Sequence, residues 1–415
     1  MLTKHKLGEL IEVTRGMSLP GEYYSETGKY VRLTMGNFNY NGGGFKENTS
    51  KTDIYYVGPV RDEYVLRKGD IITPLTEQAI GLLGTTAMIP ESGKYIQSQD
   101  VALIKCKEDK IDHLFCYYLV SSDIVKKQLS AAAQQTKIRH TSPDKIMGCT
   151  VWIPEMSLQQ MIGKTLYEID QKIALNNRMN AELEAMAKQL YDYWFVQFDF
   201  PDENGNPYKS SGGKMVYNST LKREIPAGWE DCVLSDIANI TMGQSPDGAS
   251  YNERGEGSIF YQGSTDFGIR FPSVRMYTTA PTRFAKKGDI LMSVRAPVGD
   301  TNIANSDCCI GRGLSAMNSK LGSISHLYFI IRDLKAKFDA VNAIGTTFGA
   351  ITKDELFNLP IVNPQKAVLD KFESICSPIF DNQMNLGFEI AHLTHLRDSL
   401  LPMLMNGQVT IEYVV

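Results

Sequence analysis

The sequence has little excess charge, few cysteines and no long apolar run. Its seven cysteines include no Cys-x-x-Cys pair, and an odd, unpatterned set is typical of reduced thiols. No apolar run approaches the roughly 18 residues that a membrane-spanning helix needs. The first residues turn polar and acidic too early for a signal peptide. We therefore expect a cytoplasmic protein without a membrane partner.

The sequence also lacks the common motifs of catalysis. It contains neither Gly-x-x-x-x-Gly-Lys-Ser/Thr nor Gly-x-Gly-x-x-Gly, and no Asn-Pro-Pro-Tyr-like stretch of an amino-methyltransferase. The run from Gly243 to Gly248 resembles a nucleophile elbow without its spacing. His392 and His395 are three residues apart, but no third metal ligand is near them in the sequence. We expect no catalytic residue, metal or cofactor site in this chain.

The charge of the chain says little about its partners. The net charge of −4 argues mildly against nucleic acid. Residues 259–312 are locally basic, with seven Lys and Arg residues against four Asp residues. On charge alone, an ordinary solvated surface explains this cluster better than a nucleic-acid site does.

What the sequence does contain is an internal repeat. Leu7, Thr14, Gly16 and Ser18 recur as Leu234, Thr241, Gly243 and Ser245. Five further matches follow in the same order: 30–38 with 259–267, 67–72 with 286–291, 113–114 with 326–327, 142–146 with 352–356, and 177–180 with 382–385. Repeats of this kind indicate two copies of one structural unit. The stretch 199–228, rich in Pro, Gly, Asn and Ser, is then the joint between the copies.

Each copy is predicted to begin with a mixed, mostly β domain. Short β-rich runs alternate with Gly, Asn, Ser and Pro loops, and helices are expected at 111–130 and 324–341. The predicted fold is α+β with a pseudo-twofold internal repeat. The predicted parts are a first domain at 1–155, a helical spacer at 156–198, the linker at 199–228, a second domain at 229–363 and a C-terminal helical spacer at 364–415.

Each copy is predicted to end in a long helix with an apolar stripe at steps of four and three. Such a stripe is typical of a coiled coil, and residues 157–195 would span roughly 58 Å at about 1.5 Å per residue. That length favours antiparallel pairing of the two helices over packing on one domain. Pro378 favours a kink or a later start in the second helix. The residues expected to pair the helices are Ile169, Ile173, Asn176, Asn180, Leu183, Ile375, Ile379, Asn382, Leu386 and Leu393.

Two similar domains on a rigid spacer suit a target with approximate twofold symmetry, and duplex DNA is the obvious one. Half-sites on one face of DNA lie about 34–36 Å apart. Because the copies have diverged, each would read a different half-site.

These features resemble the specificity subunit of type I restriction–modification enzymes over essentially the whole chain. The resemblance is carried by the joint at 199–215, by Gly288-Asp-Ile-Leu-Met-Ser, by Trp194-Phe195 and by the terminus at 400–407. It departs after Asp70, where Ile72-Thr-Pro-Leu-Thr-Glu-Gln replaces the usual Ser-containing run. The resemblance implies recognition of a bipartite double-stranded DNA sequence. It also implies two modification subunits that use S-adenosylmethionine to methylate adenine, and restriction subunits that use ATP and Mg.

The residues that could contact DNA come from loops of the two domains. They are Thr34, Asn37, Asn39, Lys46, Gln78, Ser264, Asp266, Arg270, Arg295 and Arg312. Amides can pair with adenine, carboxylates can accept from cytosine, and Arg can bind guanine or phosphate. Asn37 and Asp266 could equally form local turns, the Gly-rich loop after Asn39 could be a simple hairpin, and each Arg could be an ordinary surface side chain.

The leading hypothesis is therefore a non-catalytic DNA-recognition subunit. The alternative is a coiled-coil scaffold whose two domains bind proteins or glycans, which the near-neutral charge would suit.

Overall fold

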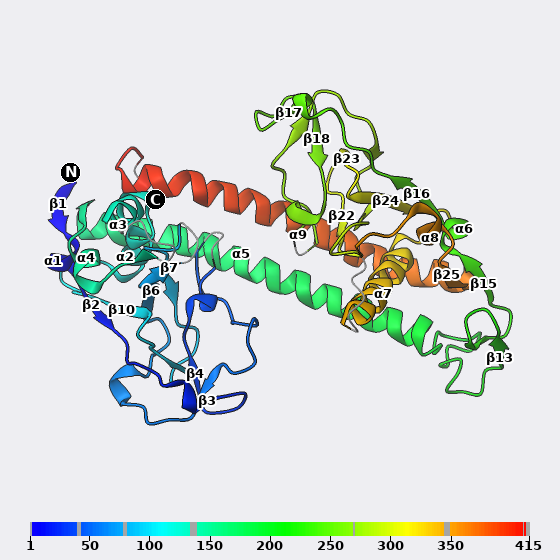
Figure 1. Cartoon of the computed structure of the whole chain (residues 1–415), viewed down its shortest axis with the longest axis horizontal. Coiled ribbons are helices and arrows are strands. Elements are labelled where there is room, and N and C mark those ends of the chain that lie inside the picture. The colour runs from blue at the N-terminus through cyan, green and yellow to red at the C-terminus, as the bar shows by residue number, and fades with distance from the viewer. Residues whose placement is uncertain are drawn as a thin grey trace. The chain divides into compact units, whose positions relative to one another are not determined.

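The chain divides into two compact units, Met1–Ala174 with Ala391–Val415, and Leu175–Ile390. The structure is a computed structural model and describes residues 2–39, 43–77, 81–132, 139–268, 270–343, 349–409 and 411 (Figure 1). Each unit combines one mostly β domain with segments of the two long helices α5 (Met156–Tyr191) and α9 (Lys366–Met405).

Unit 1 contains two small layers of strands and a group of short helices. A four-stranded sheet has the order β2-β10-β6-β8, a second has the order β3-β5-β4-β9, and β1 pairs with β12. The strands are β1 (Thr3–Lys6), β2 (Ile11–Arg15), β3 (Tyr24–Ser25), β4 (Tyr30–Arg32), β5 (Tyr55–Tyr56), β6 (Ile71–Pro74), β7 (Thr76–Glu77), β8 (Ala87–Met88), β9 (Tyr95–Ile96), β10 (Val101–Cys106), β11 (Arg139–His140) and β12 (Thr150–Ile153). The helices are α1 (Leu7–Leu10), α2 (His113–Val120), α3 (Asp123–Ala132) and α4 (Pro143–Met147).

Unit 2 repeats this topology. Its four-stranded sheet β16-β24-β21-β22 matches β2-β10-β6-β8 strand for strand, and β15 pairs with β25 as β1 pairs with β12. The strands are β13 (Met215–Asn218), β14 (Arg223–Pro226), β15 (Glu230–Val233), β16 (Ala238–Met242), β17 (Tyr251–Asn252), β18 (Ser258–Tyr261), β19 (Tyr277–Thr278), β20 (Phe284–Ala285), β21 (Ile290–Ser293), β22 (Thr301–Ile303), β23 (Cys308–Ile310), β24 (Leu314–Ser319) and β25 (Pro360–Asn363). The helices are α6 (Leu234–Ile237), α7 (Ile324–Ala343) and α8 (Lys353–Phe357). The predicted α+β fold with an internal repeat is confirmed.

The glycines that match between the copies have a packing reason. A Cβ atom on Gly16 would lie 2.3 Å from the Ser98 carbonyl oxygen, and one on Gly243 would lie 2.1 Å from that of Gly311. Both distances are shorter than any real contact, so the strand end can approach the neighbouring loop only without a side chain. Gly69 and Gly288, in the matched turns before β6 and β21, have φ values of 91° and 90°, which favour glycine.

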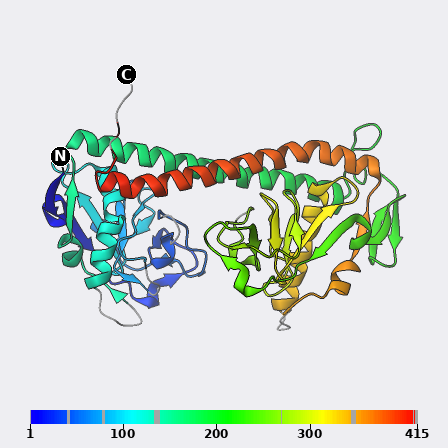
Figure 2. The same ribbon diagram turned by 90° about the horizontal axis from the view of Figure 1, so that it is seen from above.

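Within each unit, part of α5 lies beside part of α9 (Figure 1, Figure 2). In unit 1, Ile162 and Leu166 share an apolar core with Leu404 and Met405. In unit 2, the Asn176 amide donates to Glu389 at 2.9 Å. As α5 advances, its partners on α9 come from earlier positions, so the two helices are antiparallel in each unit.

The positions predicted to pair the helices are all at least half-buried on α5, but two of those on α9 are exposed. Asn176 and Leu386 are buried, and the other predicted positions are half-buried, namely Ile169, Ile173, Asn180, Leu183, Ile379 and Leu393. Ile375 is 47% exposed and Asn382 is exposed, so neither pairs the helices. Their neighbours Cys376 and Gln383 are fully buried instead.

The error in α9 concerns two adjacent pairs of positions. The pairs are Ile375 with Cys376 and Asn382 with Gln383, and steps of three and four residues fit either member of each pair. The prediction placed Ile375 in the stripe because it is more apolar, and Asn382 because it recurs in the repeat. The buried Gln383 amide is satisfied by the Asn180 carbonyl oxygen at 3.1 Å and by Glu184 at 3.2 Å. The helix begins at Lys366 and continues through Pro378, so the later start predicted at this proline is wrong.

Candidate nucleic-acid interface

A polar groove in the second domain brings together three of the predicted residues. Ser264 lies just after β18, Arg295 follows β21, and Arg312 precedes β24. These loops border one groove of about 540 Å³, whose lining also includes Gln262 and Ser293. Residues that are far apart in the sequence therefore meet because the strands that carry them are neighbours.

Both arginines of this groove are available for a ligand. Arg295 and Arg312 are exposed, and neither guanidinium forms an ion pair or a hydrogen bond with the described residues. Beside them, the Gln262 amide donates to Ser245 Oγ at 2.9 Å, and Ser245 Oγ accepts from the backbone of Arg312 at 3.2 Å. Paired arginines above amide and hydroxyl groups can bind both phosphates and base edges.

The matched loop of the first domain is built differently. The Asn37 side chain is 1% exposed, accepts from the Thr34 backbone at 2.9 Å and donates to the Lys46 carbonyl oxygen at 3.3 Å. The Thr34 hydroxyl accepts from Gly36 at 3.2 Å and from Asn48 at 3.0 Å. The structure therefore contradicts base contacts by Asn37 in this conformation, because its amide stabilises the turn. Thr34 has the same local role.

The other first-domain candidates lie near this turn. Lys46 is exposed and remains a candidate for phosphate contact. Asn39 is half-buried, and its backbone donates to Gly44 at 3.0 Å. Gln78 lies outside the described residues.

Two candidates of the second domain are held in ion pairs. The Asp266 carboxylate accepts from Arg275 at 2.8 Å and 3.3 Å, and its side chain is 7% exposed. Arg270 is 6% exposed and forms an ion pair with Glu184 of α5. Its guanidinium also lies over the rings of Tyr328 and Phe380, at 4.6 Å and 4.2 Å. Arg270 is thus a structural residue, and its predicted role in gripping DNA is wrong for this conformation.

Acidic side chains that were not predicted from the sequence attach each domain to the helices. In unit 2, Glu184 pairs with both Arg270 and Arg332. In unit 1, Asp170 accepts from the Tyr118 hydroxyl at 2.6 Å and from Arg397 at 2.9 Å. Burial and the nearby Asp170 carboxylate raise the pKa of Tyr118 far above its usual value, so its hydroxyl stays a donor. The only sequence signal for Glu184 and Asp170 is a charged residue next to an apolar helix stripe. Many solvated helix faces have the same pattern, so it does not identify such anchoring residues.

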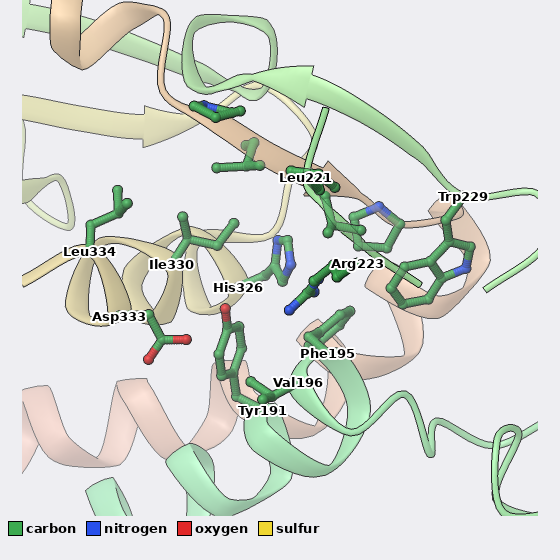
Figure 3. A pocket seen from close by; sticks show the side chains of 14 residues that line it. Tyr191, Phe195, Val196, Leu221, Arg223, Trp229, His326, Ile330, Asp333 and Leu334 are labelled. Carbon is green, nitrogen blue, oxygen red and sulfur yellow. The ribbon is translucent and has the colours of Figure 1, made fainter. Parts of the chain in front are cut away.

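A second cavity of unit 2, of about 150 Å³, lies where the linker packs on α5 and α7 (Figure 3). Tyr191 enters it from the end of α5, Phe195 from the π-helical turn Asp192–Val196 that follows, and His326 and Asp333 from α7. Burial lowers the pKa of His326 to about 3, so its imidazole is neutral. Desolvation also lowers the pKa of the Arg223 guanidinium, although the residue is exposed. A neutral histidine with so low a pKa does not serve as a general acid near pH 7.

The described residues also bear on metals and membranes. No group of three or more His, Cys, Asp or Glu side chains in the described part is placed to hold a metal ion. Among the described helices, none combines the length and apolarity required for crossing a membrane.

Both copies of the repeat match one known protein family. The model of the type I restriction modification DNA specificity domain matches residues 2–185 and 226–377, which is most of the chain and both copies of the repeat. The chain belongs to this family. As a type I specificity subunit, it acts as the DNA-recognition component of a restriction–modification system. The family does not support the alternative hypothesis of a coiled-coil scaffold that binds proteins or glycans.

Several relatives share most of their length with this specificity subunit. It is 29% identical to the putative type I restriction enzyme MjaX specificity subunit of Methanocaldococcus jannaschii, over 88% of this chain and 85% of that protein. It is 22% identical to the type I restriction enzyme HindI specificity subunit of Haemophilus influenzae, over 64% of this chain and 70% of that protein. The crystal structure of a type I restriction–modification S subunit from M. genitalium has the same fold, with a TM-score of 0.62, 15% identity and coverage of 100% and 97%.

Proposed function

We propose that each domain of this specificity subunit reads one half of a bipartite DNA sequence. The observation that carries the proposal is the repeated fold with two different reading surfaces. Arg295 and Arg312 of the second domain are replaced, at the matched strand positions of the first, by Thr76 and Gln99. The two domains share one backbone fold but carry different side chains at the matched positions, which suits recognition of two different half-sites.

The chain itself would supply recognition and no chemistry. We propose that two modification subunits bring S-adenosylmethionine and methylate adenine in each half-site, and that restriction subunits bring ATP and Mg. Non-specific DNA affinity comes mostly from neutralising phosphate charges. The near-neutral charge of this chain therefore supports a complex in which other subunits make many of the phosphate contacts. The partner subunits would therefore contribute much of the phosphate contact, and the isolated chain would bind DNA weakly.

The spacing between half-sites would depend on the length of the paired helices. Inserting one heptad after Ala174 in α5 and another after Ile390 in α9 keeps the apolar stripe in register within each unit. Seven residues lengthen a helix by about 10 Å, or roughly three base pairs at 3.4 Å each. We expect the methylated motif to keep both half-sites while the gap between them grows by about three base pairs.

Sequencing of methylated DNA measures this directly. A matched control replaces the exposed Leu175 by Ala without changing the helix length, and the motif should then stay as it is. A change in either half-site after the double insertion would contradict the proposal.

A further inference from the structure

Three chain segments of the first domain meet at one point. Thr76 is the first residue of β7, Gln99 lies in the turn before β10, and His140 is the last residue of β11. Thr76 and His140 are directly opposite each other in the antiparallel pair of β7 and β11. The Leu75 backbone amide donates to the Asp100 carbonyl oxygen at 2.8 Å, which holds Gln99 beside this pair. Residues from distant parts of the sequence are thus brought to a single place.

The second domain repeats this backbone arrangement with the same hydrogen bonds. The backbone amide of the residue before Arg295 donates to the carbonyl oxygen of the residue after Arg312, at 2.9 Å. Arg295 itself pairs with Ala350 in an isolated antiparallel bridge. Because Arg295 and Arg312 border the groove of the second domain, the matched point of the first domain is its corresponding surface. In the order Arg295, Arg312 and Ala350, the counterparts are Thr76, Gln99 and His140.

The side chains at this point of the first domain are available for a ligand. Gln99 and His140 are exposed, and Thr76 is half-buried. Within the described part of the chain, none of the three side chains forms a hydrogen bond or an ion pair. Thr34 and Asn37 differ in this respect, because their side chains hold their own turn together.

The chemistry of these side chains differs from that of the arginines in the second domain. A glutamine amide can accept from the N6 amino group of adenine and donate to N7 at the same time. A threonine methyl group can contact the methyl group of thymine, whereas an arginine pairs with guanine or phosphate. Neither Thr76 nor Gln99 carries a charge, so the first domain suits an A·T base pair better than a guanine.

We propose that Thr76, Gln99 and His140 form the reading surface of the first domain, and that Gln99 reads an adenine there; this rests on the proposed division of the target into two half-sites. Gln99 makes the two hydrogen bonds to the adenine edge, Thr76 contributes an apolar contact, and the His140 imidazole offers a further donor beside them. This adenine is not the methylated one. A glutamine bonded to N6 would occupy the amino group that receives the methyl group.

The test is binding of the assembled complex to duplexes that carry its motif with one base pair of the first half-site exchanged. For the unmodified chain, exchange of one A·T pair other than the methylated one for G·C should weaken binding by about 5-fold to 150-fold. In Q99A, the same exchange should have almost no effect, while exchanges in the second half-site should weaken binding as before. If Q99A discriminates against every exchange as the unmodified chain does, the proposal is overturned.

An arginine at position 99 should change the preferred base instead of removing the preference. The second domain carries Arg312 at the matched position, so this backbone accommodates the side chain and Q99R is expected to fold. Sequencing of methylated DNA should show that Q99R no longer requires the A·T pair, or requires G·C in its place, while the second half-site is kept. A Q99R motif identical to that of the unmodified chain would overturn the proposal.

A matched control separates this proposal from the proposed function. Gln160 is another exposed glutamine of unit 1, but it lies on α5. Q160A should leave both half-sites unchanged. The proposed function fails on a different result, which is the absence of any two-part motif with the unmodified chain. A two-part motif whose first half does not depend on Gln99 would leave that function in place and overturn only the role of Gln99.

Discussion

Replacement of both Arg295 and Arg312 by alanine is expected to weaken specific DNA binding by the assembled complex about 100-fold. Each guanidinium is exposed and free of ion pairs with the described residues, and each good contact to a base or phosphate contributes about 1–3 kcal/mol. The measurement is the dissociation constant for the methylated motif as a function of salt. If both residues bind phosphate, the slope of log affinity against log salt should fall by about two.

Arg254 provides the matched control for this experiment. It is an exposed arginine of the same domain, paired with Glu256 at 3.2 Å, and it does not border the groove. Arg254→Ala should leave DNA affinity nearly unchanged. Equal losses from Arg254→Ala and from the double variant would mean that general charge, and not the groove, determines binding.

Replacement of Glu184 by alanine is expected to destabilise unit 2 by about 3 kcal/mol. The substitution leaves Arg270, at 6% exposure, buried without its carboxylate, and an uncompensated buried charge typically costs about 3–5 kcal/mol. Urea unfolding of the full chain measures the effect. Adding Arg270→Leu to Glu184→Ala should recover much of the loss, because no buried charge then remains.

The same helix offers the control for Glu184. Glu182 pairs with Arg178 at 2.8 Å, but both side chains are exposed, at 61% and 75%. Exposed pairs of this kind contribute little, so Glu182→Ala should cost less than about 0.5 kcal/mol. If the two substitutions cost the same, Glu184 does not anchor the second domain on α5.

The repeat and the long helices could be predicted from the sequence because their signals are periodic or duplicated. Gly16 and Gly243 match because a backbone approach in both copies excludes a side chain. The α5 stripe follows the helical period over many turns. The sequence could not show whether Ile375 or Cys376 is the buried position, because both fit that period and only packing decides between them.

The reading surface was harder to predict, since it depends on which loops meet in space. Arg295 and Arg312 meet because β21 and β24 are paired, which no local pattern shows. Arg270 has the same residue type and a similar loop position, yet Glu184, far away in the sequence, holds it in the interior. Asn37 was ambiguous for another reason, because an amide suited to reading adenine is equally suited to closing a turn.

The central claim is that this chain alone determines a bipartite recognition sequence. The most direct measurement is sequencing of methylated DNA from cells that express the cognate modification subunit with and without the chain. The account predicts a two-part motif containing methyladenine that appears only when the chain is present. In cells with Arg295→Ala and Arg312→Ala, methylation should lose its dependence on one half of the motif or disappear. Absence of any chain-dependent motif, with the complex verified as assembled, would contradict the account.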